Sequence, residues 1–340
     1  MLLRRHDQSG TSGCINSIMY RNVIIISKLF NICTCITWHT PSASDVGGRG
    51  VVERGGGEEH THMANATEPK DEQEMARITS PDGTEIAYER SGSGPPLVLV
   101  HGSTVTHTYL NSVCPGFADH FTVYAIDRRG HGESSDTDEY ALEREAEDVA
   151  AIIDFVDDSA VLFGVFFGAH VSLEAALRTD NLRALILYEP WFAVGDDELY
   201  SEDLLAEMKA LDEGGEYARL LVLFNEDGIN LPPEELDALR SPSIWPGLVE
   251  EARTLYREAE AANEYEFEPA RFAEMTTPTA LLMGNNHTRM RVDFTSLMDE
   301  LHEALPDSRI VILEGQGHHA VNTAPDLVID EILSFVRESI

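Results

Sequence analysis

Runs of hydrophobic residues alternate with polar and helical segments from residue 75 to the C-terminus, and this pattern predicts strands and helices in turn. The runs at 96–102 and 121–127 are almost entirely apolar, as expected for strands buried on both faces of a sheet. Pro81, Asp82 and Gly83 form a turn signature, so the two runs on either side of it should pair as a hairpin. The expected strands are residues 75–80, 84–92, 96–102, 121–127, 160–164, 184–190, 278–284 and 308–315.

Helical spacing of apolar residues separates several of these strands. Within residues 141–156 the apolar positions recur every three or four residues, which predicts an amphipathic helix. Further helices are expected at 169–178, near 293–304, and from Pro325, since proline suits the first turn of a helix. The pattern predicts an α/β fold: a mostly parallel, eight-stranded sheet with helices on both faces.

Residues 191–272 break the alternation of strands and helices. The segment is acidic and helical in pattern, it lacks buried-strand runs, and prolines interrupt it at 232–233, 242 and 246. We therefore expect a helical lid inserted after the sixth strand, with the core formed by residues 63–190 and 273–340.

The first 62 residues differ in composition from the remainder. Residues 22–38 are the one candidate for an export or membrane segment, but Lys28 and Asn31 interrupt it and no clean cleavage site follows. Residues 47–62 are rich in glycine and lack periodicity. We expect 1–62 to be a poorly ordered or spurious extension, with the natural protein beginning at Met63; a membrane or targeting leader is the alternative.

The charge is strongly negative. The whole chain carries −36, and residues 63–340 contain 18 basic against 55 acidic residues, a net of −37, with Lys70 and Lys209 as their lysines. Such a chain repels nucleic acid and anionic lipid, which excludes both as main partners. Many carboxylates with few lysines resemble the composition of proteins from haloarchaea and other salt-accumulating organisms, where molar salt screens the repulsion. The alternative is simply an acidic protein.

Cysteine usage points to a reducing compartment. Cys14, Cys33 and Cys35 lie in the first 40 residues, and Cys114 is alone in the rest of the chain. The main body therefore has no disulfide framework, which indicates a cytoplasmic protein. One residue separates Cys33 from Cys35, a spacing that is typical of neither metal nor redox sites, so we expect no metal.

Four motifs, in a characteristic order, resemble those of the α/β-hydrolase superfamily, and the resemblance covers residues 75–340. They are His101-Gly102 after the third strand, "DRRGHGESS" at 127–135, "GVFFG" at 164–168 and "GQGHHAVNTAPDLVIDEILSFV" at 315–336. The resemblance implies a hydrolase of a small molecule that needs no cofactor. It also implies a serine nucleophile, a histidine base, an acid that orients this histidine, and backbone amides that stabilise an oxyanion.

The base and the oxyanion-stabilising amides have counterparts in this sequence. Gly317-His318 matches the Gly-His of the family, so the resemblance assigns His318 as the base, with a shift to His319 as the alternative. Amides near Ser103 and Phe167 would form the oxyanion hole. A surface loop without a catalytic part is the alternative for that loop, because backbone donors do not depend on side-chain identity.

The acid position departs from the family pattern. His287 stands where the carboxylate usually follows the seventh strand, and Asn285 and Asn286 precede it. Some relatives take the acid from the end of the sixth strand, where this chain has Glu189. The resemblance therefore offers Glu189 as a relocated acid, with a purely structural carboxylate as the alternative and Asp293 as a weaker substitute.

The nucleophile position also departs from the pattern. "GVFFG" has the spacing of a G-x-S-x-G elbow, but its central residue, Phe166, has no nucleophilic atom. A shift by one residue offers only Val165 or Phe167. Ser103 belongs to the oxyanion loop on the wrong side for attack, and Cys114 is expected to be a packed core thiol. Serine-dependent catalysis should therefore be lost, since removal of a triad serine lowers turnover about 10⁶-fold.

Three functions stay open at this point. The resemblance favours a hydrolase for a small ester or lactone. The missing nucleophile favours a pseudoenzyme, which binds a small ligand beneath the lid or a partner protein. The third hypothesis is nucleophile-independent hydrolysis, lyase or oxygenase chemistry based on His318, which could activate water directly.

Overall fold

The computed structural model describes residues 75–339 apart from 196–197, 232 and 287–291. The expected extension 1–62, its three cysteines and the start at Met63 lie outside the described residues. So does His287, the residue at the usual acid position.

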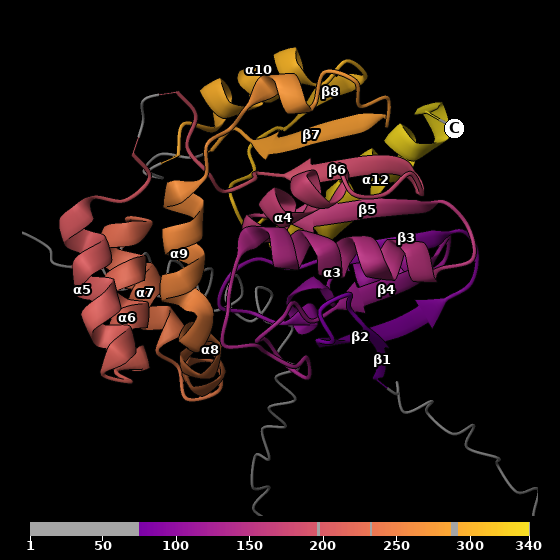
Figure 1. Ribbon diagram of the computed structural model, residues 1–340. Helices are drawn as coiled ribbons and strands as arrows, with labels where there is room; N and C mark the ends of the chain where they lie inside the picture. The colour runs from indigo at the N-terminus through magenta and orange to yellow at the C-terminus, as the bar shows by residue number, and fades with distance from the viewer. Residues whose placement is uncertain (1–74, 196–197, 232, 287–291, 340) are drawn as a thin grey trace, which may run out of the picture.

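One sheet organises the described residues, and it has the expected eight strands (Figure 1). The strand order is β1-β2-β4-β3-β5-β6-β7-β8. Strands β1 and β2 form the predicted antiparallel hairpin, β2 also pairs antiparallel with β4, and the strands from β3 to β8 are parallel. The bounds are β1 Ala76–Thr79, β2 Glu85–Gly92, β3 Pro96–Val100, β4 Thr122–Ile126, β5 Ala160–Val165, β6 Leu182–Tyr188, β7 Thr279–Gly284 and β8 Ser308–Leu313.

Helices cover both faces of the sheet, and each face has its own core. In β3, Val98 and Val100 pack into one core, whereas Leu97 and Leu99 pack into the other, because side chains alternate along a strand. The first core is closed by α3 (Leu142–Phe155), α4 (Phe167–Ala175) and α10 (Phe294–Ala304). The second is closed by η1 (His107–Leu110), α2 (Cys114–Ala118), α11 (Ala320–Thr323) and α12 (Pro325–Ser339).

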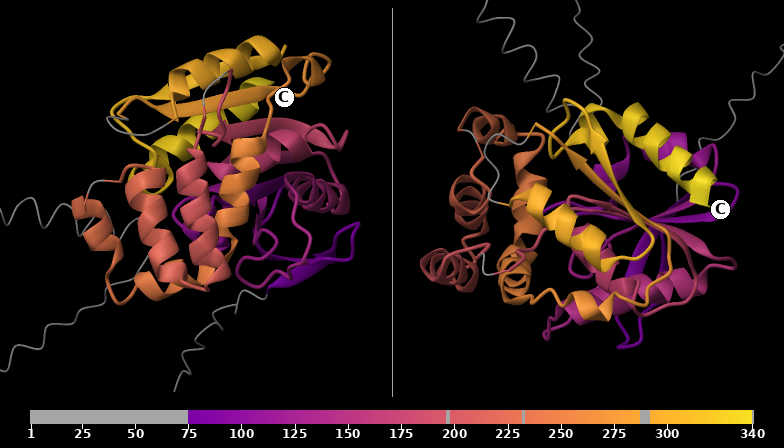
Figure 2. Two further views of the ribbon diagram at one scale, coloured as in Figure 1. Left: turned by 60° about the vertical axis from the view of Figure 1, so that its left-hand side comes forward. Right: turned by 90° about the horizontal axis from the view of Figure 1, so that it is seen from above.

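A group of helices lies between β6 and β7 in the chain and packs beside one end of the sheet (Figures 1 and 2). We call it the helical insertion. Pro233 and Pro246 stand in the first turns of two of its helices, where proline costs no hydrogen bond. Its elements are α5 Glu202–Glu213, α6 Tyr217–Leu223, the π-helical turn η2 Phe224–Gly228, α7 Pro233–Leu239, α8 Trp245–Glu251, η3 Ala252–Thr254, α9 Leu255–Glu264 and η4 Pro269–Arg271.

Several boundaries differ from the expected ones by one to three residues, and two of them flank the candidate site. Strand β6 ends at Tyr188 rather than at residue 190, because Glu189 has a φ of 47° and leaves the extended conformation. Helix α4 begins at Phe167 rather than at 169, directly after the elbow residue Phe166. The hydrophobic run at 160–167 continues through the bend at Phe166 and therefore does not reveal it.

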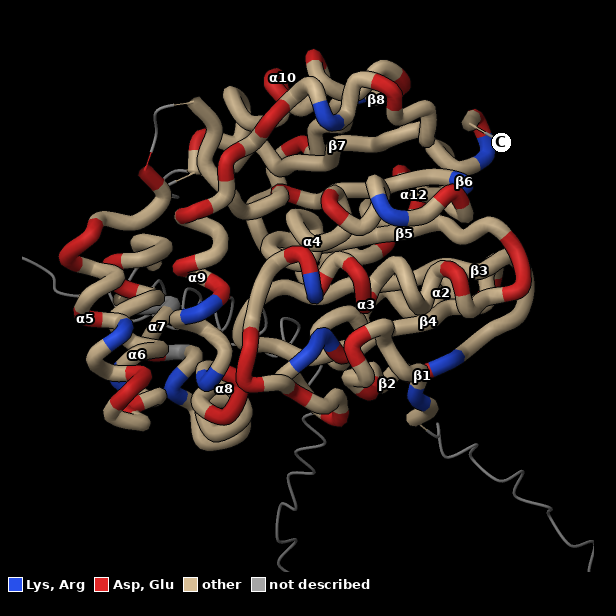
Figure 3. The backbone as a smooth tube through the Cα atoms, viewed as in Figure 1, with Lys and Arg blue, Asp and Glu red and all other residues tan. Residues whose placement is uncertain are grey.

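Acidic residues occur along the helices of both the core and the insertion, and basic residues are fewer (Figure 3). Arg128 and Arg129 are exceptions to the usual surface position of arginine, because both side chains are fully buried. The guanidinium of Arg129 lies 2.6 Å from Asp148 and 3.0 Å from Asp82. Some of the acidic residues therefore form buried or partly buried ion pairs with arginine.

Candidate active site

The turn from β5 to α4 has the sharp geometry of a nucleophile elbow. Phe166 has φ 57° and ψ −121°, a backbone conformation that is rare for a bulky residue. A Cβ atom on Gly168 would lie 2.2 Å from the carbonyl oxygen of His101, and one on Gly164 would lie 2.4 Å from Oγ of Ser172. Both glycines are therefore required for the close contact of the turn with its neighbours, whatever residue stands at the centre.

The structure brings His318 and Glu189 together. Nδ1 of His318 lies 2.6 Å from Oε2 of Glu189, and Oε1 of Glu189 accepts a hydrogen bond of 2.8 Å from the backbone N–H of Gly284. The Glu189 side chain is fully buried. A carboxylate can only accept, so Nδ1 of His318 carries the proton, and neutral His318 then has its lone pair on Nε2.

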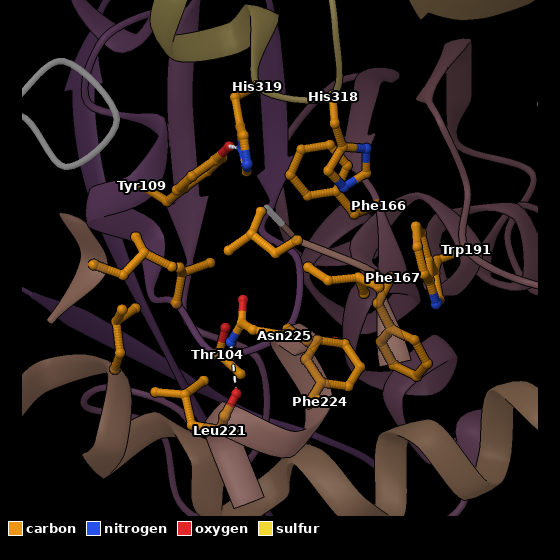
Figure 4. A pocket seen from close by; sticks show the side chains of 16 residues that line it. Thr104, Tyr109, Phe166, Phe167, Trp191, Leu221, Phe224, Asn225, His318 and His319 are labelled. Atoms are coloured by element: carbon orange, nitrogen blue, oxygen red, sulfur yellow. Dashed lines mark hydrogen bonds between the residues drawn. The ribbon is translucent and has the colours of Figure 1, made fainter. Parts of the chain in front are cut away.

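An aromatic ring occupies the place beside His318 where the family has its serine. The rings of Phe166 and His318 stack with centroids 3.6 Å apart and an angle of 22° between their planes (Figure 4). Phe294 and Trp191 approach the same imidazole at 5.9 and 5.6 Å. The position of His318 is thus set by aromatic packing as well as by Glu189, and no nucleophilic atom stands at the elbow.

The oxyanion loop after β3 has a fixed peptide orientation. The carbonyl oxygen of Gly102 lies 2.7 Å from Nδ1 of His101 and accepts a hydrogen bond of 3.1 Å from Nη1 of Arg128. This peptide is trans, so the N–H of Ser103 points to the opposite side, away from Arg128. Phe167 is the first residue of α4, and its amide has no acceptor within the helix. Both expected oxyanion residues, Ser103 and Phe167, line the same cavity.

A buried charge network connects this loop with the helical insertion. Arg128 makes two hydrogen bonds of 2.7 Å to Glu145 on α3 and lies 2.9 Å from Glu258 on α9. Nδ1 of His131 lies 2.8 Å from Glu251, and Nε2 lies 2.7 Å from Glu258. Both ring nitrogens face carboxylates, so both donate and His131 is protonated. Burial opposes this charge, but the two carboxylates outweigh it and raise the pKa of His131.

The neighbouring His101 is neutral. Burial, together with the charges of His131 and Arg128, holds the pKa of His101 well below its usual value. Its Nε2 accepts a hydrogen bond of 3.0 Å from the backbone N–H of Arg128, so the proton lies on Nδ1 and is donated to Gly102. The network therefore determines the tautomer that holds the oxyanion loop.

His319 has a different partner from His318. Its Nδ1 lies 2.9 Å from the hydroxyl of Tyr109, and burial together with the nearby His318 lowers the pKa of His319 to about 3. His319 is therefore neutral at physiological pH. Of the two neighbouring histidines, His318 is the one that faces Glu189.

The remaining candidates for the acid lie elsewhere. Oδ1 of Asn285 accepts a hydrogen bond of 2.7 Å from the backbone of Gly315, and Asp293 caps the N-terminus of α10 through the amides of Thr295 and Ser296. His287 lies outside the described residues. Among the candidate acids that the structure describes, Glu189 is the one bonded to a histidine.

The alternative nucleophiles are also engaged or buried. Ser103 lies close to the buried Glu258 and contributes, after Arg128 and His131, to the lowered pKa of that carboxylate. Cys114 packs in the core around α2, and burial raises the pKa of its thiol to about 12. Neither group is an activated nucleophile in this arrangement, because a thiol reacts as its thiolate.

A cavity of about 120 Å³ lies between the core and the helical insertion, next to His318 (Figure 4). A second hollow of about 210 Å³ shares Thr104, Val105, Tyr109 and Leu248 with it. The walls are mainly apolar and aromatic. The cavity is lined by Ser103, Thr104, Val105, Tyr109, Phe166, Phe167, Trp191, Leu221, Phe224, Asn225, Ile229, Leu231, Leu239, Leu248, His318 and His319.

Eleven of these sixteen lining residues were not singled out from the sequence. Seven of its residues, from Leu221 to Leu248, belong to the insertion. The available signal was the presence of apolar residues within an acidic helical segment, which does not tell a cavity wall from a packed core. In the part of the chain that the structure describes, no group of three or more histidine, cysteine or acidic side chains could hold a metal ion. None of the described helices is long and apolar enough to cross a membrane.

The sequence pattern of the alpha/beta hydrolase family matches residues 97–331. The chain belongs to this family. A solved alpha/beta hydrolase from Sphaerobacter thermophilus is 36% identical, with a TM-score of 0.68 and coverage of 76% of this chain and 99% of that one. A 2-(acetamidomethylene)succinate hydrolase from Mesorhizobium japonicum is 23% identical over 271 residues, which cover 77% of this chain and 93% of the relative.

An esterase from Exiguobacterium antarcticum has a similar structure, with a TM-score of 0.61, 22% identity, and coverage of 77% of this chain and 99% of the esterase. At this identity the likeness concerns the fold alone. The relatives thus agree with the α/β-hydrolase fold expected from the sequence motifs.

Proposed function

We propose that this protein binds a small, mainly apolar molecule in the cavity beneath the helical insertion, and that His318 acts on it as a general base without an acyl-enzyme. The observation that carries the proposal is the 2.6 Å contact between Nδ1 of His318 and the fully buried Glu189. A buried carboxylate is costly unless it is paired and hydrogen-bonded. Here its partners orient an imidazole that lines the cavity.

The proposed step is hydrolysis of a small ester or lactone by water. Nε2 of His318 takes a proton from water as its oxygen attacks the acyl carbon, and the amides of Ser103 and Phe167 stabilise the resulting oxyanion. The intermediate then expels an alkoxide, which receives the proton from His318. General-base catalysis typically contributes about 10²–10⁴-fold, so turnover should be slow compared with that of a serine esterase.

The helical insertion would serve as the lid, because it supplies nearly half of the cavity lining. The net charge of −36 supports assays in molar salt, where repulsion among carboxylates is screened. Absence of a cofactor and a cytoplasmic location remain part of the proposal.

The test compares the full chain with His318→Ala and Glu189→Gln on p-nitrophenyl acetate and on a lactone in molar salt. His120→Ala is the matched control, because His120 is exposed and remote from the cavity lining. We expect slow turnover that falls about 10²-fold or more in His318→Ala and is unchanged in the control. A serine-directed fluorophosphonate should not label the protein. Turnover that survives His318→Ala, or stoichiometric labelling, would contradict the proposal.

A ligand-binding protein without turnover is the second candidate. The stacking of Phe166 on His318 at 3.6 Å favours it, because the ring occupies space that an acyl group would need. This candidate predicts that a small molecule binds in the cavity while the full chain and His318→Ala show the same background hydrolysis.

A further inference from the structure

Asn225 is a buried polar residue in the otherwise apolar part of the cavity that the insertion forms. Its side chain is only 6% exposed, and it lies in the π-helical turn η2. Nδ2 of Asn225 donates a hydrogen bond of 2.7 Å to the carbonyl oxygen of Leu221. A carbonyl oxygen can only accept, so this contact assigns which end of the amide is nitrogen. Oδ1 therefore lies on the other side, and Figure 4 shows it directed into the cavity.

The backbone around Asn225 holds this orientation. The carbonyl oxygen of Asn225 accepts a hydrogen bond of 2.7 Å from the N–H of Leu231, and the N–H of Ile229 closes the wide turn on the carbonyl of Phe224 at 2.8 Å. Wide π-type turns re-aim side chains and occur often at functional sites. The backbone hydrogen bonds and the hydrogen bond from Nδ2 to Leu221 together fix the orientation of the Asn225 side chain.

Among the described residues, the hydrogen bond of the Asn225 side chain is the one that Nδ2 donates to Leu221, and no donor of the protein contacts Oδ1. The nearby lining from the insertion is apolar: Leu221, Phe224, Ile229, Leu231, Leu239 and Leu248. This oxygen is accessible within the cavity, and an apolar ligand that fills the cavity would leave it without a hydrogen-bond partner. A ligand that brings a donor to this oxygen avoids the loss of a hydrogen bond and should therefore bind more tightly than an apolar ligand of the same shape.

We propose that Asn225 selects small, mainly apolar ligands that carry one hydrogen-bond donor, a hydroxyl or an N–H, facing the insertion. His318 lies on the opposite, core-formed wall of the cavity, so the donor is at a different part of the ligand from the group that His318 contacts. The inference rests on the proposed function for the location of the ligand. It goes beyond that function because it names the chemical class of the ligand.

The test uses two probes of nearly equal shape, phenol and toluene, of which only phenol has a donor. Equilibrium binding to the full chain is measured by ligand-observed NMR in molar salt. We expect Asn225→Leu to weaken phenol binding about 10-fold while toluene binding stays within about twofold, as expected for one lost hydrogen bond. Leu231→Ile is the matched control, which alters an apolar part of the same lining and should leave the ratio of the two affinities unchanged.

Asn225→Gln is the second variant, which keeps both the amide donor for Leu221 and the acceptor oxygen. It should retain the preference for phenol even if Asn225→Leu does not fold. Equal weakening of both probes in Asn225→Leu, loss of the preference in Asn225→Gln, or failure of both probes to bind the unmodified protein would each overturn the inference.

The probes contain no bond that can be hydrolysed, so the result does not depend on catalysis. Selective loss of phenol binding in Asn225→Leu, together with turnover that is independent of His318, would refute the general-base proposal and leave the inference on Asn225 intact.

Discussion

Replacement of Phe166 by serine would return a nucleophile to a turn whose other parts are in place. The backbone at 166 already has φ 57°, and Nδ1 of His318 is already 2.6 Å from Glu189. Serine also removes the ring that stacks on His318 at 3.6 Å. The site of the Phe166→Ser variant would then contain the nucleophile, base, acid and oxyanion amides of a serine hydrolase.

The size of the effect follows from the parts that are present. Loss of a triad serine lowers turnover about 10⁶-fold, which is the upper limit for what its return can supply. We expect turnover to rise about 10³-fold, which corresponds to an activation barrier lower by about 4 kcal/mol. The gain should stay below the upper limit because aromatic packing rather than a serine now sets the position of His318. The cost in stability should be below the ~3–5 kcal/mol of a fully buried Phe→Ala change, since Phe166 is only half-buried.

The assay measures the initial burst and steady-state release of p-nitrophenol from p-nitrophenyl acetate in molar salt, with fluorophosphonate labelling at residue 166 read by mass spectrometry. Phe166→Ala is the control, because it opens the same space without a hydroxyl. Adding Glu189→Gln to Phe166→Ser should remove most of the gain. A folded Phe166→Ser protein that stays unlabelled and no faster than Phe166→Ala would refute the assignment of His318 and Glu189 as a working pair.

Two further predictions concern the frame of the site. Gly168→Ala should fail to fold, or its free energy of unfolding should fall by more than about 3 kcal/mol, because the new Cβ would lie 2.2 Å from the carbonyl oxygen of His101. Chemical denaturation measures this change. Unchanged stability would contradict the close contact between the elbow and the oxyanion loop. The pKa of His131 is raised by Glu258 and Glu251, so its contribution to stability is fully present below about pH 6.5 and is lost as pH rises through the folded-state pKa. The free energy of unfolding should thus fall between pH 6 and pH 9 by more in the unmodified protein than in His131→Gln; equal slopes would show that His131 is not the group that titrates.

Much of the fold could be predicted from the sequence because its signals are local. Continuous apolar runs mark β3, β5 and β7, whose residues are all buried, and Pro81-Asp82-Gly83 marks the first hairpin. The helix over Leu142–Phe155 agrees with the predicted 141–156 to within one residue at each end. Boundaries were missed where a single residue changes backbone conformation, as Glu189 does at the end of β6.

The candidate site was predicted only in part. The Gly-His motif pointed to His318, and the family resemblance made Glu189 one of several choices for the acid. The structure puts Glu189 against His318 and Asp293 at a helix cap. These residues are 129 and 25 positions from His318, and the choice between such distant carboxylates depends on strand crossovers that no local pattern describes.

The sequence by itself determined the alternation of strands and helices, the glycine-bounded elbow and the absence of a nucleophilic atom at Phe166, because each depends on residue type and short-range spacing. Only the tertiary structure decided that Phe166 stacks on His318, that Arg128 and His131 tie the oxyanion loop to α8 and α9, and that Oδ1 of Asn225 faces the cavity. Each of these depends on the packing of segments that are distant in the chain. Burial of the charges of Arg128 and His131 is acceptable only because such packing supplies their partners.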